Sequence, residues 1–293
     1  MTASLKRLAA TLWQADGRRF PASLSLLLVG PLVIGLCVAF ILPVGRLLSV
    51  SVWNPDFTLA EFVHIAESPL YLRILGRTLL LGITVTALTL VLAYPVAFLM
   101  ARLSGWRLAV ATACVLVPLW TSVLVRSYAW IIILQRNGLL NSVLMGLGLT
   151  DAPLPLLYNE LSVTIAMTHV LLPYMILPIW AALRTIPRDL PLAAQSLGAK
   201  ASRVFFLVVL PLSLPGVASG VLMVFILSLG FYVTPALVGG PETLMVATLI
   251  GQQTTELLNW PFAGALAALL LGITLLLVTV FNRFLGLDKK AAS

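Results

Sequence analysis

Residues 79–100 read LLLGITVTALTLVLAYPVAFLM and contain no charged side chain. A helix needs about 20 apolar residues to cross the hydrocarbon core of a bilayer, so this stretch is long enough for one span. Five further uncharged stretches have a comparable or greater length. We predict six transmembrane helices from Leu24–Val44, Leu79–Met100, Leu108–Val125, Leu161–Leu183, Val204–Val238 and Phe262–Phe281.

The composition of the whole chain agrees with this interpretation. Of the 293 residues, 60 % are hydrophobic and 10 % are charged, whereas a soluble domain is about 45–50 % apolar and about 25 % charged. A water-soluble fold could not bury so much apolar surface. A soluble enzyme, a secreted disulfide scaffold and a disordered protein are therefore excluded. We predict an all-α polytopic membrane protein.

Two uncharged stretches do not fit a simple span. The stretch Val204–Val238 is too long for one helix and is interrupted by Pro211 and Pro215. We expect its span to start near Pro211, with the preceding part at the membrane surface. The stretch Asn137–Thr150 is only 14 residues long and contains glycines, so we expect an interfacial helix there.

The basic residues determine the predicted orientation. An even number of spans places both termini on one side, and if that side is the cytoplasm, 13 of the 18 basic residues lie inside. This bias predicts that both termini are cytoplasmic. It also explains the net charge of +8 without a nucleic-acid partner. The predicted inner residues are Lys6, Arg7, Arg18, Arg19, Arg102, Arg107, Arg184, Arg188, Lys200, Arg203, Arg283, Lys289 and Lys290.

The predicted spans lack the residues that catalysis needs. They contain no carboxylate and one histidine, His169, which we expect to be hydrogen-bonded between helices rather than to act as a base or a ligand. The sequence has no HExxH, no GxSxG and no P-loop. Cys37 and Cys114 are far apart and fall inside apolar runs. We therefore assign no catalytic residue and no metal site, and a transporter or channel subunit is the default interpretation.

The longest patterned inner loop is RTIPRDLPLAAQSLGAKASR at 184–203. Asp189 is suited to an N-cap, and Gly198 is suited to the left-handed residue after a helix. Between them, apolar residues follow helical spacing and predict a helix of about two turns. The residues of this apolar stripe are Leu190, Ala193, Ala194 and Leu197. Such a helix either rests on lipid headgroups or docks into a partner protein, and the pattern alone leaves both open.

Residues 192–198 read LAAQSLG, and VLP follows at 209–211. Together they resemble the EAA loop of permease subunits of type I ABC importers, which reads roughly EAA-x-x-x-G. Further stretches are similar to the spermidine/putrescine-type branch of that family. They are VPLWTSVLVRSYAW (117–130), NGLLN (137–141), AYPVA (93–97), YVTPA (232–236), GG (239–240) and NWPF (259–262).

The resemblance implies a single transmembrane permease domain over 1–293 in the bacterial inner membrane, with a cytoplasmic N-terminal segment (1–23), a cytoplasmic coupling loop (184–203) and a cytoplasmic tail (285–293). It also implies partners: a second permease chain, ATPase subunits and an extracytoplasmic binding protein that delivers a small molecule. ATP and magnesium would be bound by the ATPase subunits, so this chain holds no cofactor of its own.

The resemblance also implies which residues contact the ATPase. These are Leu190, Leu192, Ala193, Ala194, Leu197, Gly198, Ala199 and Pro211. Leu192 occupies the position of the motif's glutamate. We expect docking to persist through shape and apolar contact, while any polar contact made by that glutamate is missing from this subunit.

For the substrate path we select a set of aromatic and charged residues. They are Trp120, Arg126, Tyr128, Tyr174, Tyr232 and Glu242. Aromatic faces can hold cations, and Arg126 and Glu242 are expected near the outer mouth. Each aromatic residue could equally belong to the core or to an interfacial belt, and Arg126 could extend to the interface. The branch suggests polyamines, but the spans hold no carboxylate, so amino-acid derivatives and opines remain open.

Two other classes of membrane protein fit the sequence less well. A secondary transporter would need a coupling-ion site and often an inverted repeat, and neither is found. A non-transporting scaffold would leave the patterned inner loop unexplained.

Gly216 and Gly220 form a GxxxG spacing that permits close helix packing, either within the subunit or against a second permease.

Overall fold

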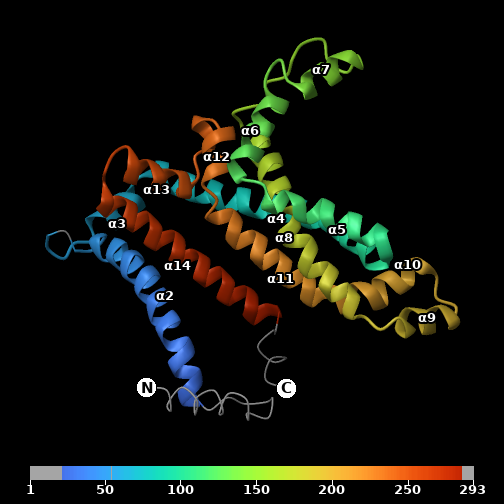
Figure 1. The fold of residues 1–293 in the computed structure, drawn as a ribbon. Helices are drawn as coiled ribbons and strands as arrows, with labels where there is room; N and C mark the ends of the chain where they lie inside the picture. Colours follow the sequence, from blue (N-terminus) through green and yellow to red (C-terminus); the bar gives the residue numbers. More distant parts are fainter. Residues whose placement is uncertain (1–21, 54, 286–293) are drawn as a thin grey trace, which may run out of the picture.

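The computed structural model describes residues 22–53 and 55–285, which fold into helices joined by short connections (Figure 1). The predicted cytoplasmic segments 1–23 and 285–293 lie almost entirely outside these residues. Five helical stretches are long and apolar enough to cross a membrane. They are α2 (Ala22–Val50), α4 (Pro69–Arg102), α8 (Glu160–Thr185), the continuous helix Ala201–Leu229 and α14 (Trp260–Leu285).

The third predicted span, Leu108–Val125, is not one straight helix. It is divided between α5 (Gly105–Trp120) and α6 (Val123–Leu134), and α5 lies at 99° to the segment Val123–Gly146. The Thr121 hydroxyl donates to the carbonyl of Pro118 at 2.8 Å. This side chain takes the place of the backbone N–H that would donate to the same carbonyl if the helix continued. Counting this bent pair as one span gives six, as predicted.

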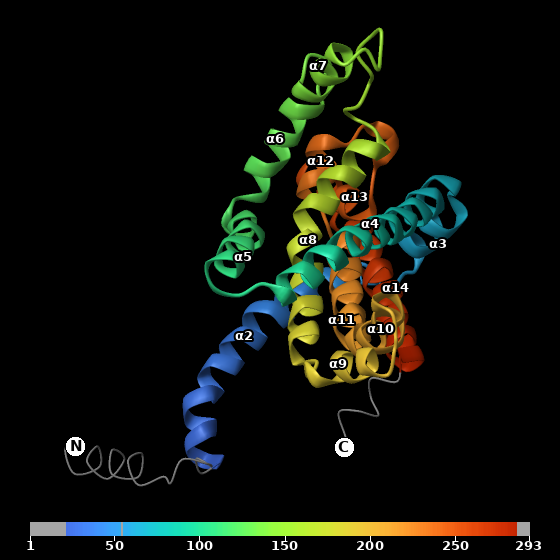
Figure 2. The ribbon, with the colours of Figure 1, turned by 90° about the vertical axis from the view of Figure 1, so that its right-hand side faces the viewer.

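A short helix, α7 (Leu139–Gly146), follows α6 and confirms a helix within the uncharged stretch 137–150. Figure 2 shows α5, α6 and α7 along one side of the bundle, where α6 contacts α8 and α12 (Val233–Val238). After the bend, the chain runs along α8 and α12 as α6 and continues through α7 to the start of α8.

The fifth span begins earlier than predicted. Its helix starts at α10 (Ala201–Val204), passes through one π-helical stretch, Phe205–Val209, and continues as α11 (Leu210–Leu229). The N–H of Leu210 donates to the carbonyl of Phe205, five residues back. This wider turn accommodates Pro211, which has no N–H, without ending the helix. The predicted start near Pro211 is therefore wrong.

The core lies where α4, α8 and α11 pack together. Two glycines allow α11 to approach α8 closely. A Cβ at Gly216 would lie 2.6 Å from the carbonyl oxygen of Pro178, and one at Gly220 would lie 2.8 Å from the sulfur of Met175. The GxxxG spacing therefore serves packing within this subunit, one of the two predicted alternatives.

The two ends of the bundle match the sides assigned from charge. At one end, the Tyr158 N–H before α8 donates to the carbonyl of Val238 at 3.1 Å, so α8 begins beside the end of α12. At the other end, Arg102, Arg184 and Ala201 line one cavity, so α4 ends, α8 ends and α10 begins together. We call these the outer end and the inner end.

A second apolar cluster lies at the outer end. It joins α3 (Ala60–Glu67), the first turns of α4, α13 (Val246–Thr255) and the start of α14. The Val246 N–H donates to the Thr78 hydroxyl at 3.0 Å. The first turns of α4 are thus packed against protein, which explains why this helix begins ten residues before the predicted Leu79.

Candidate functional site

The inner loop contains the predicted helix, α9 (Asp189–Ser196), and none of its side chains is buried. Asp189 is the first helical residue rather than the N-cap, because Arg188 already has helical backbone angles (φ −62°, ψ −26°). The N-cap is therefore Arg188, one residue before the predicted Asp189. At its actual position the carboxylate of Asp189 still interacts favourably with the helix dipole.

The end of α9 has the predicted geometry. Gly198 has φ +83°, which L-residues with a side chain rarely adopt. Its N–H donates to the carbonyl of Gln195 at 2.8 Å, and the N–H of Ala199 donates to the carbonyl of Ala194 at 3.1 Å. These two bonds form a Schellman motif. The helix therefore ends at a fixed residue and turns sharply towards α10.

The apolar stripe of α9 is not covered by the rest of the described chain. Within the stripe, Leu197 is 89 % exposed and Leu190 is 45 % exposed; Leu192, which lies outside the stripe, is 57 % exposed. Pro211 lies beyond the π-helical stretch in α11 and is not part of this surface. The α9 stripe is thus a small apolar surface that ends in a rigid turn at the inner end, and such surfaces are suited to protein contact.

Arg126 lies deeper than predicted. It belongs to the first turn of α6, is 8 % exposed, and has no hydrogen-bond partner for Nε or Nη1 among the described residues. It lies near His169 and Tyr174, which are about halfway along α8. The break before α6 directs this guanidinium into the bundle, so it does not extend to the interface.

Two hydrogen bonds hold α6 in place next to Arg126. The indole N–H of Trp130 donates to Nδ1 of His169 at 3.3 Å, which confirms the prediction of an inter-helix hydrogen bond for this histidine. The hydroxyls of Ser127 and Thr234 lie 2.9 Å apart and join α6 to α12. We did not select Ser127, Trp130 or Thr234 from the sequence. Trp130, four residues after Arg126, had a helical spacing with it that was visible in the sequence, whereas Ser127 and Thr234 had no such signal.

The remaining predicted path residues are dispersed. Tyr174 is half-buried near Arg126, whereas Trp120 at the end of α5 is 85 % exposed. Tyr128 and Tyr232 are exposed on α6 and beside α12. Glu242 is exposed at the outer end, in the short turn Pro241–Thr243. The structure therefore brings together Arg126 and Tyr174 but does not join the whole set into one pocket.

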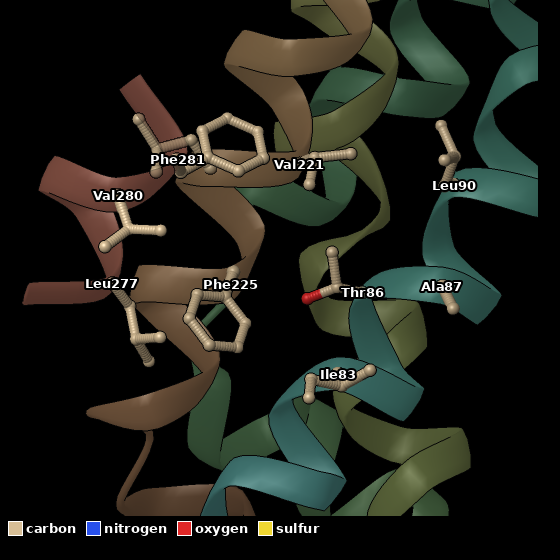
Figure 3. Close-up of a pocket in the computed structure, with 10 residues that line it drawn as sticks. Ile83, Thr86, Ala87, Leu90, Val221, Phe225, Leu277, Val280 and Phe281 are labelled. Carbon is tan, nitrogen blue, oxygen red and sulfur yellow. The ribbon is translucent and has the colours of Figure 1, made fainter. Parts of the chain in front are cut away.

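An apolar cleft of about 480 Å³ lies between α4, α11 and α14 (Figure 3). Its lining is hydrocarbon except for Thr86, whose hydroxyl already donates to the carbonyl of Gly82 at 2.7 Å. The cleft therefore offers no polar group to a polar solute and does not define a substrate site. Within residues 22–53 and 55–285, no three His, Cys, Asp or Glu side chains gather where they could hold a metal ion.

A helical bundle of five or six spans with an exposed, capped helix between two core helices fits a membrane permease. The chain belongs to the family described as "Binding-protein-dependent transport system inner membrane component", which matches residues 93–287. It is a multi-pass permease subunit of an ABC importer in the bacterial inner membrane.

Curated relatives support this assignment. The chain is 33 % identical over 216 residues to the spermidine/putrescine permease PotB of Haemophilus influenzae, covering 74 % of this chain and 76 % of that protein. It is 31 % identical over 227 residues to PotB of Escherichia coli, covering 78 % and 82 %. It is 35 % identical over 224 residues to the inner membrane ABC transporter permease YdcU of E. coli, covering 72 % and 71 %.

Solved structures confirm the fold. A chain of a bacterial ABC transporter that imports the acidic polysaccharide alginate superimposes with a TM-score of 0.68, at 18 % identity over 89 % of this chain and 94 % of that chain. The alginate transporter in complex with its oligosaccharide-bound periplasmic protein gives a TM-score of 0.70, at 18 % identity over 89 % and 93 %. The type I importer permease fold implied by the EAA-like loop is therefore confirmed.

Proposed function

We propose that this chain is one of two permease subunits in an ATP-driven importer and that α9 is its contact with an ATPase subunit. The exposed α9 stripe at the inner end supports this proposal most directly. ATP and magnesium are bound by the ATPase subunits. A second permease, expected to be a different chain, completes the path, and an extracytoplasmic binding protein delivers the solute.

The connections of α9 suggest how movement is transmitted. The helix lies between α8 and the continuous helix Ala201–Leu229, and these two pack closely through Gly216 and Gly220. A displacement of α9 therefore acts on two core helices that move as one unit. Closure of the ATPase pair draws the two coupling loops together and opens the path outward, and hydrolysis resets it. This is alternating access by rigid-body rocking.

Leu192 modifies this contact. It is 57 % exposed at the position where the family motif has glutamate. In our proposal the ATPase holds α9 by shape and apolar contact alone, and the second permease supplies the polar contact. A secondary transporter, the alternative considered from the sequence, would have no ATPase partner.

The chain offers a matched pair of variants to test the contact. Leu197 ends α9, and Leu147 ends α7; both helices have eight residues, and both leucines are exposed, at 89 % and 69 %. We would purify the tagged chain from native membranes in gentle detergent and identify its partners by mass spectrometry. Wild type and Leu147→Asp should retain an ATPase and a second permease, and Leu197→Asp should lose the ATPase. Equal recovery of the ATPase with Leu197→Asp would refute the contact.

We further propose that the solute is a polyamine. The relatives named for spermidine and putrescine support this. So do the acidic side chains at the outer end, Glu160 and Glu242, and the exposed aromatic faces of Tyr128 and Tyr232, because carboxylates attract cations and aromatic faces hold them. Selectivity then resides mainly in the binding protein.

A single observation favours a second solute class. Arg126 is a buried cation without a partner among the described residues, and it would attract a carboxylate and repel a polycation. An amino-acid derivative or an opine would fit this group. Uptake of labelled solutes separates the two classes: labelled putrescine should accumulate and unlabelled spermidine should compete with it, whereas labelled octopine should not accumulate. Accumulation of labelled octopine without accumulation of putrescine would favour the second class.

A further inference from the structure

We propose that a cavity at the inner end binds the phosphate headgroup of an anionic phospholipid. The cavity has a volume of about 800 Å³ and is enclosed by α9 together with parts of α4, α5, α8 and the π-helical stretch. Three arginines line it, each from a different place: Arg102 ends α4, Arg184 lies in the last turn of α8, and Arg188 precedes α9.

Among residues 22–53 and 55–285, these arginines have no anionic partner in the cavity. No aspartate or glutamate is among the lining residues. Aromatic rings hold two of the guanidinium groups instead: Arg102 lies 4.0 Å from the ring centre of Phe98, and Arg184 lies 5.5 Å from that of Trp180. Three cations around one space repel one another, and a bound phosphate would relieve this repulsion while accepting their hydrogen bonds.

The rest of the lining points to a lipid rather than a soluble anion. Beside the arginines, the lining contains apolar side chains from Ala101, Leu108, Leu183, Val204 and Val209, together with the polar Ser104 and Gln195. Cationic and apolar side chains in one cavity match a phosphorylated headgroup with the beginning of its acyl chains. Basic pockets between transmembrane helices on the cytoplasmic side bind such headgroups. The volume also lies within the range of about 300–1,000 Å³ that is typical of ligand pockets.

Such a lipid would also contact the coupling helix. Pro191, Leu192 and Gln195 of α9 line the same cavity as the ends of α4 and α8. A bound lipid would therefore connect α9 to two core helices and resist its displacement relative to them. Any effect on coupling rests on the proposed function, whereas lipid binding itself does not. Binding is thus the quantity to measure first.

The experiment uses the purified importer complex, delipidated in detergent and titrated with phosphatidylglycerol or phosphatidylcholine. Native mass spectrometry counts the lipids retained by the complex. The test variant is Arg102→Gln/Arg188→Gln. The control is Arg107→Gln/Arg203→Gln, which removes two inner arginines that are exposed, as Arg102 and Arg188 are, but do not line the cavity. A third arm replaces lipid with inorganic phosphate and asks whether phosphate displaces bound phosphatidylglycerol.

We expect wild type and control to prefer phosphatidylglycerol, and the test variant to bind it roughly 30-fold more weakly, because each basic residue near a headgroup contributes about 1 kcal/mol. Inorganic phosphate should compete poorly because it lacks the acyl chains. Equal binding by test and control variants would overturn the proposal, as would efficient displacement by inorganic phosphate. Loss of the ATPase from the test variant with the lipid retained would assign the arginines to a protein contact instead.

Discussion

The N–H of Ala199 donates to the carbonyl of Ala194 at 3.1 Å, across Gly198 in the left-handed conformation. The same arrangement closes α7, where the N–H of Leu149 donates to the carbonyl of Leu144 at 3.0 Å across Gly148, with φ +68°. The chain therefore has two eight-residue helices with the same C-terminal motif, α9 at the inner end and α7 beyond α6. Changes in α7 report local strain without altering the coupling helix.

Replacing Gly198 by valine should uncouple transport. A side chain in the left-handed region costs about 1–2 kcal/mol, which is enough to reopen the turn that orients α9. No atom lies within 4 Å of the added Cβ at Gly198 or at Gly148, so Gly148→Val has the same backbone strain without a clash. We expect solute uptake to fall at least tenfold in Gly198→Val and to remain near wild type in Gly148→Val.

Both variants should insert and assemble, which co-purification of the second permease can verify. Normal uptake by an assembled Gly198→Val importer would contradict a coupling role for this turn. An equal loss in both variants would indicate a general effect of strain instead.

Gly216→Ala should destabilise the subunit. Its Cβ would lie 2.6 Å from the backbone carbonyl oxygen of Pro178, which cannot move without shifting α8, and such overpacking typically costs about 1–3 kcal/mol. Gly35→Ala in α2 is the control, because no atom lies within 4 Å of its added Cβ. Thermal unfolding in detergent should give a lower midpoint for Gly216→Ala only. Equal midpoints would argue against tight packing of α8 on α11.

The contact between Trp130 and His169 should be structural. Trp130→Phe, His169→Phe and the double variant form a cycle for the hydrogen bond of 3.3 Å. We expect a coupling energy of about 0.5–1.5 kcal/mol in detergent unfolding, as for a neutral hydrogen bond. Uptake should survive in all three variants. Complete loss of uptake in His169→Phe, with normal assembly, would show that this histidine has a direct role in transport.

Arg126→Met separates the two solute classes. Burying a cation without a partner lowers the free energy of unfolding. Replacing it by an apolar residue of similar length should therefore leave the stability of the subunit unchanged or raise it. For a polyamine substrate, uptake should not fall, because a repelling charge is removed. A fall of tenfold or more in the assembled importer would contradict the polyamine proposal and favour an anionic solute.

The sequence predicted the spans well because apolar length is the property that a bilayer selects. It did not predict the bend at Thr121, because the residues on both sides of the break are equally apolar. Hydropathy measures how apolar a stretch is and contains no information on the direction of the backbone. The Pro211 prediction failed for a related reason. A proline excludes one hydrogen bond, but a π-helical turn before it can restore a continuous helix.

The coupling helix was predictable because its signals are local: helical spacing of apolar residues, followed by a glycine at the left-handed position. The surroundings of Arg126 and of the inner arginines were not. Arg102 and Arg188 are far apart in the chain, and only the packing of α4 against α8 brings them to one cavity. Such sites depend on tertiary contacts that no single stretch of sequence encodes.

Uptake into proteoliposomes that contain the purified importer complex distinguishes ATP-driven import from secondary transport. Labelled spermidine and the binding protein are placed outside, and either ATP is enclosed or an ion gradient is imposed. We predict accumulation that requires both ATP and the binding protein, with no accumulation from a proton or sodium gradient alone. Accumulation driven by an ion gradient without ATP would contradict the account and identify a secondary transporter.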